Sequence, residues 1–159
     1  MIDYFELEKE VLEWINKARS YPKSIVPHLK EMLPAFNGQY FKHLRTGVNV
    51  LTEEGDFAVF EAISYLINRD PVEPLKYSKG LTRAARDLAY DIGPKGLISH
   101  QGSDQSTMAQ RAERYGKFGS LIAENISFSE ITGKDIVLQF LIDDGDRNRS
   151  SRNNILSTE

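Results

Sequence analysis

Residues 136–156 read IVLQFLIDDGDRNRSSRNNIL, and the apolar first part of this run gives way abruptly to a polar second part. The first part is apolar on most sides, which predicts a deeply buried helix from Ile136 to about Asp143. Thr132 and Asp135 stand ahead of it in a capping-box pattern, with Asp in the reciprocal place. Residues 144–154 are rich in Gly, Asn and Arg, which predicts a loop.

Outward from this run, helices dominate the predicted structure. Apolar residues recur at steps of three and four along other segments, which is the spacing of a helix face that packs on a core. Thr52 is the expected N-cap of one of these helices, and alternating apolar residues predict a strand over 121–128. The pattern predicts helices over 3–19, 53–68 and 79–92, short helical turns over 22–38, and a short helix from Ser106-Thr107 to before Gly116.

Length and composition favour one ordinary globular domain over residues 1–159, because 40% of the residues are hydrophobic and 27% are charged. The net charge of -3, with scattered basic residues, argues against a nucleic-acid partner. No apolar run is long enough to cross a membrane. The acidic N-terminal residues do not resemble a signal peptide. The chain has no cysteine, so disulfides and thiolate zinc sites are excluded.

Five short motifs follow one another along most of the chain in a familiar order. They are Asn16 to Arg19, Leu75-Lys76-Tyr77-Ser78 with the helix after it, Ser99-His100-Gln101-Gly102-Ser103, Ala123-Glu124-Asn125-Ile126, and Asp143-Asp144-Gly145 to Ser151-Arg152-Asn153-Asn154-Ile155. In this order they resemble the CAP superfamily of SCP-like, cysteine-rich secretory, antigen 5 and pathogenesis-related class one proteins. The resemblance implies an α+β fold, a three-layer α-β-α sandwich rich in helix. The insertion Met108 to Tyr115 is typical of its bacterial-like subgroup.

The resemblance also implies a cleft that holds two histidines and two acidic residues around a divalent metal. Carried over to this chain, the metal ligands are His100, Glu124 and Asp143, and Asn125 and Ser151 complete the cleft. Ser151 stands where the family has its second histidine. A serine hydroxyl is a poor zinc ligand near neutral pH. We therefore expect zinc to bind weakly or not at all.

Other chemistry at these positions has less support. Ser150 or Ser151 could act as a nucleophile only with an adjacent base, and the chain has no Gly-x-Ser-x-Gly elbow. The acidic run 143–146 lacks the alternating ligands and terminal Glu of a calcium loop. His100 could instead be a loop histidine bonded to a nearby carboxylate, and Glu124 a buried acid with a required partner. His28 and His43 are interpreted as surface or packing residues.

Three functions remain open. The resemblance implies a secreted, non-enzymatic binding domain for sterols, other lipids or protein partners, and residues 25–41 would either line a lipid groove or belong to the core. The alternative is a metal-dependent hydrolase that uses Glu124 as general base. The third is a cytosolic relic of the fold within a larger assembly. Relatives continue past position 159 into further strands, so an exposed sheet edge is expected that could pair with a second chain.

Overall fold

The computed structural model describes residues 3–119 and 121–158, which form two compact units. The first unit comprises the chain up to Leu75 together with Glu130–Thr158, and the second unit comprises Lys76–Ser129. Helices are the main elements of both units, and a small antiparallel sheet belongs to the first. The α+β, helix-rich class is therefore confirmed.

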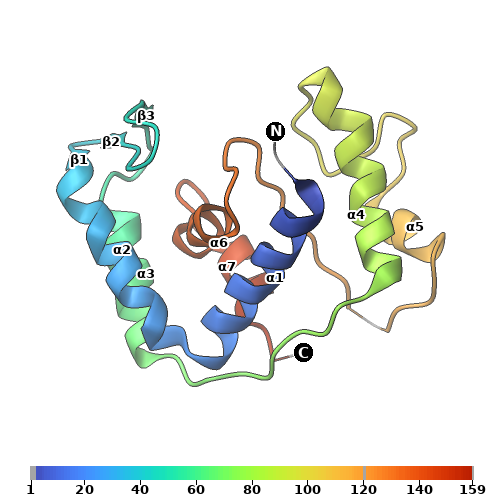
Figure 1. The fold of residues 1–159 in the computed structure, drawn as a ribbon, viewed down its shortest axis with the longest axis horizontal. Coiled ribbons are helices and arrows are strands. Elements are labelled where there is room, and N and C mark those ends of the chain that lie inside the picture. The colour runs from blue at the N-terminus through green and yellow to red at the C-terminus, as the bar shows by residue number, and fades with distance from the viewer. Residues whose placement is uncertain (1–2, 120, 159) are drawn as a thin grey trace. The chain divides into compact units, whose positions relative to one another are not determined.

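The first unit is built around α6 (Gly133–Ile142), the helix predicted from the apolar run. Most of its residues are buried, and α1 (Tyr4–Ser20), α3 (Phe57–Asn68) and α7 (Ser150–Leu156) pack against it. Figure 1 shows α6 in orange between blue α1 and the pair formed by α2 (Val26–Met32) and α3. The prediction of deep burial for this helix is confirmed.

Gly133 is where α6 approaches α1 most closely. A Cβ at this position would lie 2.5 Å from the backbone carbonyl carbon of Glu10, and the Gly133 N–H donates to the Glu10 carboxylate at 3.0 Å. The missing side chain thus lets two helix backbones touch, and the carboxylate satisfies one of the free N–H groups at the start of α6.

The predicted buried faces are correct only in part, because Leu81 of α4 (Lys79–Ile92) and Phe60 and Ile67 of α3 are exposed, whereas caps and bounds agree better. Asp3 caps α1 by accepting the N–H groups of Phe5 and Glu6, and α4 has the predicted bounds. Thr107 and Gln110 form a reciprocal capping box at the start of α5 (Met108–Glu113). Residues 22–35 form the predicted short turns, which are α2 flanked by the 3-10 turns Pro22–Ile25 and Leu33–Ala35.

The sheet lies where no strand was predicted. Its strands β1 (Phe36–Asn37), β2 (Tyr40–Lys42) and β3 (Asn49–Leu51) pair in that order, and Phe36 faces Phe41 with ring centroids 4.9 Å apart. Gly38, at φ 60°, makes the tight turn between the first two strands. The Asn37-Gly38 pair was the available signal, and the prolines that precede it masked the short strands.

Three local predictions are wrong. Residues 121–128 form no strand, because no neighbouring strand among the described residues offers them hydrogen bonds. The predicted loop 144–154 contains α7, whose Ile155 and Leu156 are buried. The N-cap of α3 is Asp56 and not Thr52, whose hydroxyl donates to the carbonyl of Gln39.

Among the helices of residues 3–119 and 121–158, none combines the length with the apolar content that a membrane-spanning helix requires.

We predict that Gly133→Ala destabilises the first unit by about 1–3 kcal/mol, because the added methyl group must separate α1 from α6. Urea unfolding followed by circular dichroism measures the change. Gly93→Ala is the matched control, because a Cβ there meets nothing within 4 Å. Equal stability of the two variants would contradict the close approach of α1 and α6.

Candidate functional site

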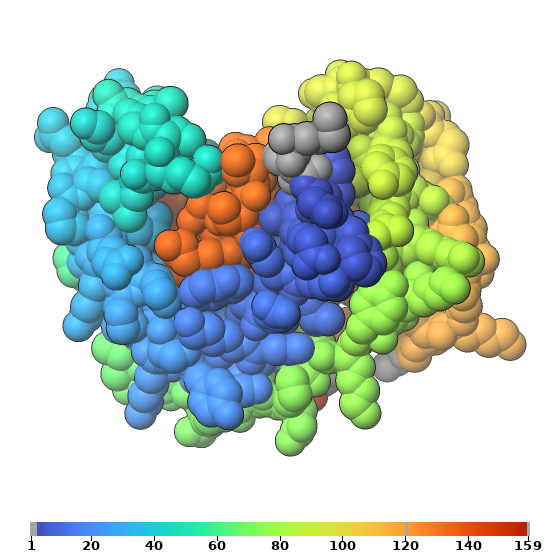
Figure 2. Space-filling model, in the orientation of Figure 1, coloured from blue at the N-terminus to red at the C-terminus, as the bar shows by residue number. Residues whose placement is uncertain are grey.

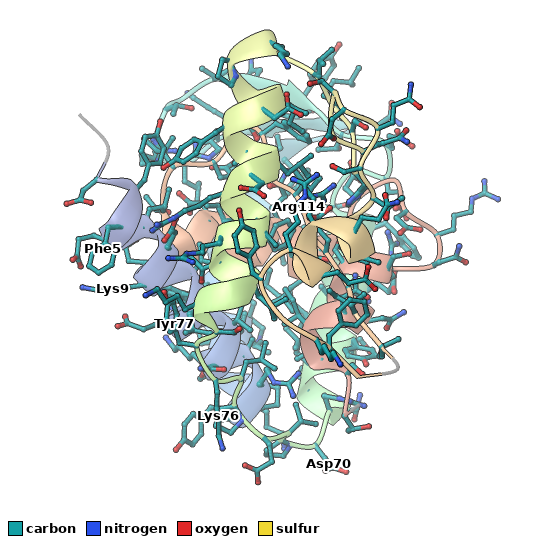
Figure 3. The ribbon with its side chains drawn as sticks, turned by 90° about the vertical axis from the view of Figure 1, so that its right-hand side faces the viewer. Phe5, Lys9, Asp70, Lys76, Tyr77 and Arg114 are labelled. Atoms are coloured by element: carbon teal, nitrogen blue, oxygen red, sulfur yellow. The ribbon has the colours of Figure 1, made fainter. Side chains whose placement is uncertain are left out.

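In the second unit, the polar loop that carries His100 is fastened to the last turn of α4. Asp91 accepts the N–H of Ser103 at 2.6 Å and also binds Lys95. The Lys95 ammonium and the Ser103 hydroxyl hold the pKa of the Asp91 carboxyl well below its usual range. Arg114, labelled in Figure 3, ties the loop to the same helix by binding both Asp87 and Asp104. The loop therefore has a defined conformation.

His100 and Glu124 are brought together at this loop. The Nδ1 atom of His100 lies 3.0 Å from Oε1 of Glu124. A carboxylate can only accept, so neutral His100 carries its proton on Nδ1 and keeps a lone pair on Nε2. The imidazole is 64% exposed, whereas the Glu124 side chain is only 14% exposed. The structure thus presents one imidazole nitrogen to solvent, oriented by a carboxylate behind it.

The partner that Glu124 requires is Arg111. Its guanidinium donates to both carboxylate oxygens, at 2.9 and 2.7 Å, and it is buried. The same group donates to the backbone carbonyls of His100 and Ser106. One buried arginine therefore fixes both ends of the loop and the acid that orients its histidine.

Asp143 and Ser151, the other two predicted cleft residues, also lie together. Asp143 adopts a left-handed conformation at φ 53°, and its carboxylate accepts the N–H of Ser151 at 2.7 Å. This contact satisfies a free N–H at the start of α7. The Asp143–Ser151 pair belongs to the first unit, and the His100–Glu124 pair belongs to the second, with half-buried Asn125 beside Glu124.

A family model for CAP, the cysteine-rich secretory protein family, matches residues 12–159. The chain belongs to the CAP family. No curated protein and no solved structure matches the chain in the corresponding comparisons. The narrower bacterial-like subgroup stays a prediction.

In this CAP-family chain, the predicted metal ligands are poorly suited to bind zinc with high affinity. His100 offers a free Nε2, but Glu124 is committed to Arg111 and His100, and Asp143 caps α7. The resemblance predicts the family's second histidine at position 151, where this chain has Ser. These contacts leave a single imidazole as the one strong donor of the predicted set.

In this CAP chain, the carboxylates of the acidic run that follows α6 accept hydrogen bonds from backbone N–H groups. Asp144 accepts the N–H groups of Glu53 and Glu54, and Asp146 accepts those of Asn148 and Ser150. The carboxylates therefore cap separate backbone groups instead of converging on one point, as calcium would require.

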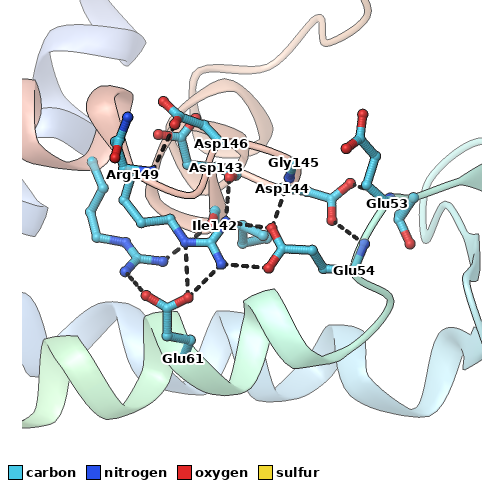
Figure 4. Close-up of polar contacts among 12 residues, drawn as sticks. Glu53, Glu54, Glu61, Ile142, Asp143, Asp144, Gly145, Asp146 and Arg149 are labelled. Carbon is cyan, nitrogen blue, oxygen red and sulfur yellow. Dashed lines mark hydrogen bonds and ion pairs between the residues drawn. The ribbon is translucent and has the colours of Figure 1, made fainter.

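Behind this run lies a network of two arginines and two glutamates, drawn in Figure 4. Arg149 binds Glu54 through two nitrogens, at 2.6 and 2.7 Å, and also binds Glu61. Arg152 binds Glu61 and the carbonyls of Leu141 and Ile142 at the end of α6. The Arg149 hydrogen bonds lower the pKa of Glu54 to about 2 and also lower the pKa of Glu61. Every member has a partner, so the network closes α6 and α7 onto α3.

A third polar cluster joins the sheet to the start of α6. His43 Nε2 lies 3.1 Å from Glu130 Oε2, and Arg45 lies within 3.6 Å of both Glu130 and Asp135. One ligand atom from each of His43, Glu130 and Asp135 lies within 4.8 Å of the others, close enough to hold a metal ion. His43 was interpreted as a surface or packing residue, because no motif surrounds it in the sequence.

Two other predictions concern packing. His28 packs edge-on against Trp14 at 5.1 Å, and its burial lowers its pKa. Ile25, Leu29 and Phe41 are buried in the core of the first unit. For these three side chains, residues 25–41 belong to the core, as one of the two interpretations predicted, and do not line a lipid groove.

We predict that Glu54→Gln destabilises the chain at neutral pH and that the difference from the wild type disappears in acid. The folded pKa of Glu54, about 2, lies below the ordinary 4.5. A depressed pKa stabilises the fold above the ordinary value, and this stabilisation is lost as the pH falls toward the folded value. Urea unfolding between pH 7 and pH 2 tests this, with Glu13→Gln on the exposed side of α1 as control. A difference that stays constant over this range would contradict the Arg149–Glu54 pairing.

Proposed function

We propose that this chain is a non-enzymatic CAP-family binding domain whose second unit presents His100 and its apolar neighbours to a ligand. The proposal rests on the hydrogen bonds that the Glu124 carboxylate accepts. A general base must direct a lone pair at the water that it activates. Both oxygens of Glu124 instead accept hydrogen bonds from Arg111, and one of them also contacts His100. This arrangement favours an orienting role for Glu124 over the hydrolase alternative.

The residues before His100 suit a ligand that has both an apolar and a polar part. Ile98 is 80% exposed, and Leu97 is also exposed. Apolar side chains in water favour an apolar contact, and the Nε2 lone pair of His100 can accept a hydrogen bond from a hydroxyl. A sterol carries both features, so the family's association with sterols and lipids agrees with this surface.

The family also carries the expectation of an extracellular protein, which we propose for this chain. We also propose that zinc binds weakly or not at all at the predicted metal site. The ligands of that site are His100, Glu124 and Asp143, with Asn125 and Ser151 in the cleft. Pairing of two chains through a sheet edge stays a prediction, and β1 and β3 are the edges of the described sheet.

We predict that the purified chain binds a hydroxylated sterol with one-to-one stoichiometry and that His100→Ala and Ile98→Ser each weaken this binding several-fold. Native mass spectrometry with cholesterol as the probe measures the adduct. Tyr77→Ser is the matched control, because Tyr77 is also an exposed apolar side chain of the second unit but precedes α4 and its contacts to the loop. Sterol binding that is unchanged in both loop variants would overturn the placement of the ligand at His100.

A separate assay tests the hydrolase alternative. We expect no ester hydrolysis above background with zinc added, in the wild type or in Glu124→Gln. A zinc-dependent activity with ester substrates that Glu124→Gln abolishes, while circular dichroism shows that the variant folds, would replace the binding function with a catalytic one.

A further inference from the structure

We propose that His43, Glu130 and Asp135 form a second site, for a divalent transition metal such as zinc, and that the Arg45 guanidinium takes the cation's place when no metal is bound. The site shares no residue with the predicted CAP cleft and does not depend on the proposed ligand. It lies where the turn after β2 meets the segment leading into α6. Figure 2 shows the teal atoms of this hairpin beside the orange atoms of that segment.

The spacing of the side chains suits a small cation. Two ligands of a tetrahedral zinc ion, each about 2.1 Å from the metal, lie about 3.4 Å apart. The His43 Nε2 and Glu130 Oε2 atoms are already 3.1 Å apart, and Asp135 completes a set within 4.8 Å. Shifts of up to about 1.4 Å in the Asp135 side chain would bring three donors around one point, with a fourth position left for water.

The two carboxylates of this cluster favour a nearby cation, and the Arg45 guanidinium contacts them only at long distances. The His43, Glu130 and Asp135 side chains are between 13% and 20% exposed, so the two carboxylates are partly desolvated. Arg45 contacts them at 3.4 and 3.6 Å, whereas a strong charge-assisted hydrogen bond measures about 2.7–2.9 Å. The Arg45 side chain is 37% exposed and makes one contact with each carboxylate. A divalent ion can therefore displace it at a small cost in free energy.

The donor set selects the class of metal. One imidazole with two carboxylates suits zinc and similar borderline cations, whereas magnesium and calcium prefer oxygen ligands alone. Two carboxylates also neutralise a divalent charge without help from Arg45.

Metal binding has a structural cost at the turn itself. The Nδ1 atom of His43 accepts the N–H groups of Arg45 and Thr46, at 3.3 and 3.2 Å. A metal on Nε2 moves the ring proton to Nδ1, which then faces these two donors. The N–H groups of Arg45 and Thr46 must therefore lose this acceptor as the metal binds, while the hydrogen bond from the Gly47 N–H to the His43 carbonyl still closes the turn.

We predict that zinc binds once at this site and that His43→Gln and Glu130→Gln each weaken binding at least tenfold. Competition with a chromophoric chelator, after removal of metal with EDTA, measures the affinity. The variants are made in a His100→Ala chain, so that the exposed imidazole of the second unit adds no zinc binding of its own.

The decisive variant is Arg45→Met, which we expect to bind zinc several-fold more tightly because the competing guanidinium is gone. Lys42→Met is its matched control, since it removes the same charge from the adjacent strand β2 without touching the acids. A purely structural cluster would show no gain from Arg45→Met. Zinc affinity equal in Arg45→Met and Lys42→Met, or equal in His43→Gln and its parent, would overturn the site. If His43→Gln does not fold, the comparison of Arg45→Met with Lys42→Met still decides.

Discussion

The central interaction of the second unit is the ion pair between buried Arg111 and half-buried Glu124. This unit contains no strand among its described residues, so its long connecting segments lack the backbone ladder that a sheet would supply. Arg111 replaces that ladder locally by donating to two backbone carbonyls and to both oxygens of Glu124. Removing one partner of such a pair leaves an uncompensated buried charge, which costs about 3–5 kcal/mol.

Buried arginines close the first unit in the same way. Arg152 and Arg149 join the end of α6 and the start of α7 to Glu61 on α3. Arg19, on α1, donates to carbonyls at Glu73, Ile155 and Ser157, and its burial lowers its pKa. A guanidinium has five donors in a planar fork and can satisfy several carbonyls at once. In a chain without cysteine, these side chains tie distant backbone segments together without a covalent link.

The sequence was sufficient for the elements whose signal is local. The spacing of apolar residues predicted α1, α4 and α6, and the side chain of Thr132 caps α6 where the sequence predicts a cap. The sequence alone did not predict elements whose conformation depends on contacts between residues outside the local pattern. The start of α7 is held by Asp143 and Asp146, and a run of Ser, Arg and Asn gives no periodic signal for a helix. Burial of Glu124 implied a partner, but nothing in the sequence singled out Arg111 among the other arginines.

The same pair shapes the function that we propose, because a carboxylate held by Arg111 orients His100 and is not available as a base. A double-mutant cycle on Arg111→Met and Glu124→Gln tests this most directly, with urea unfolding followed by circular dichroism. Each single change is expected to cost about 3 kcal/mol or more, and the double variant little more than Arg111→Met alone, because both changes remove the Arg111–Glu124 pair and only Arg111→Met also removes the carbonyl contacts. Additive losses would mean that the two side chains act independently, and the account of a sequestered Glu124 would then be wrong.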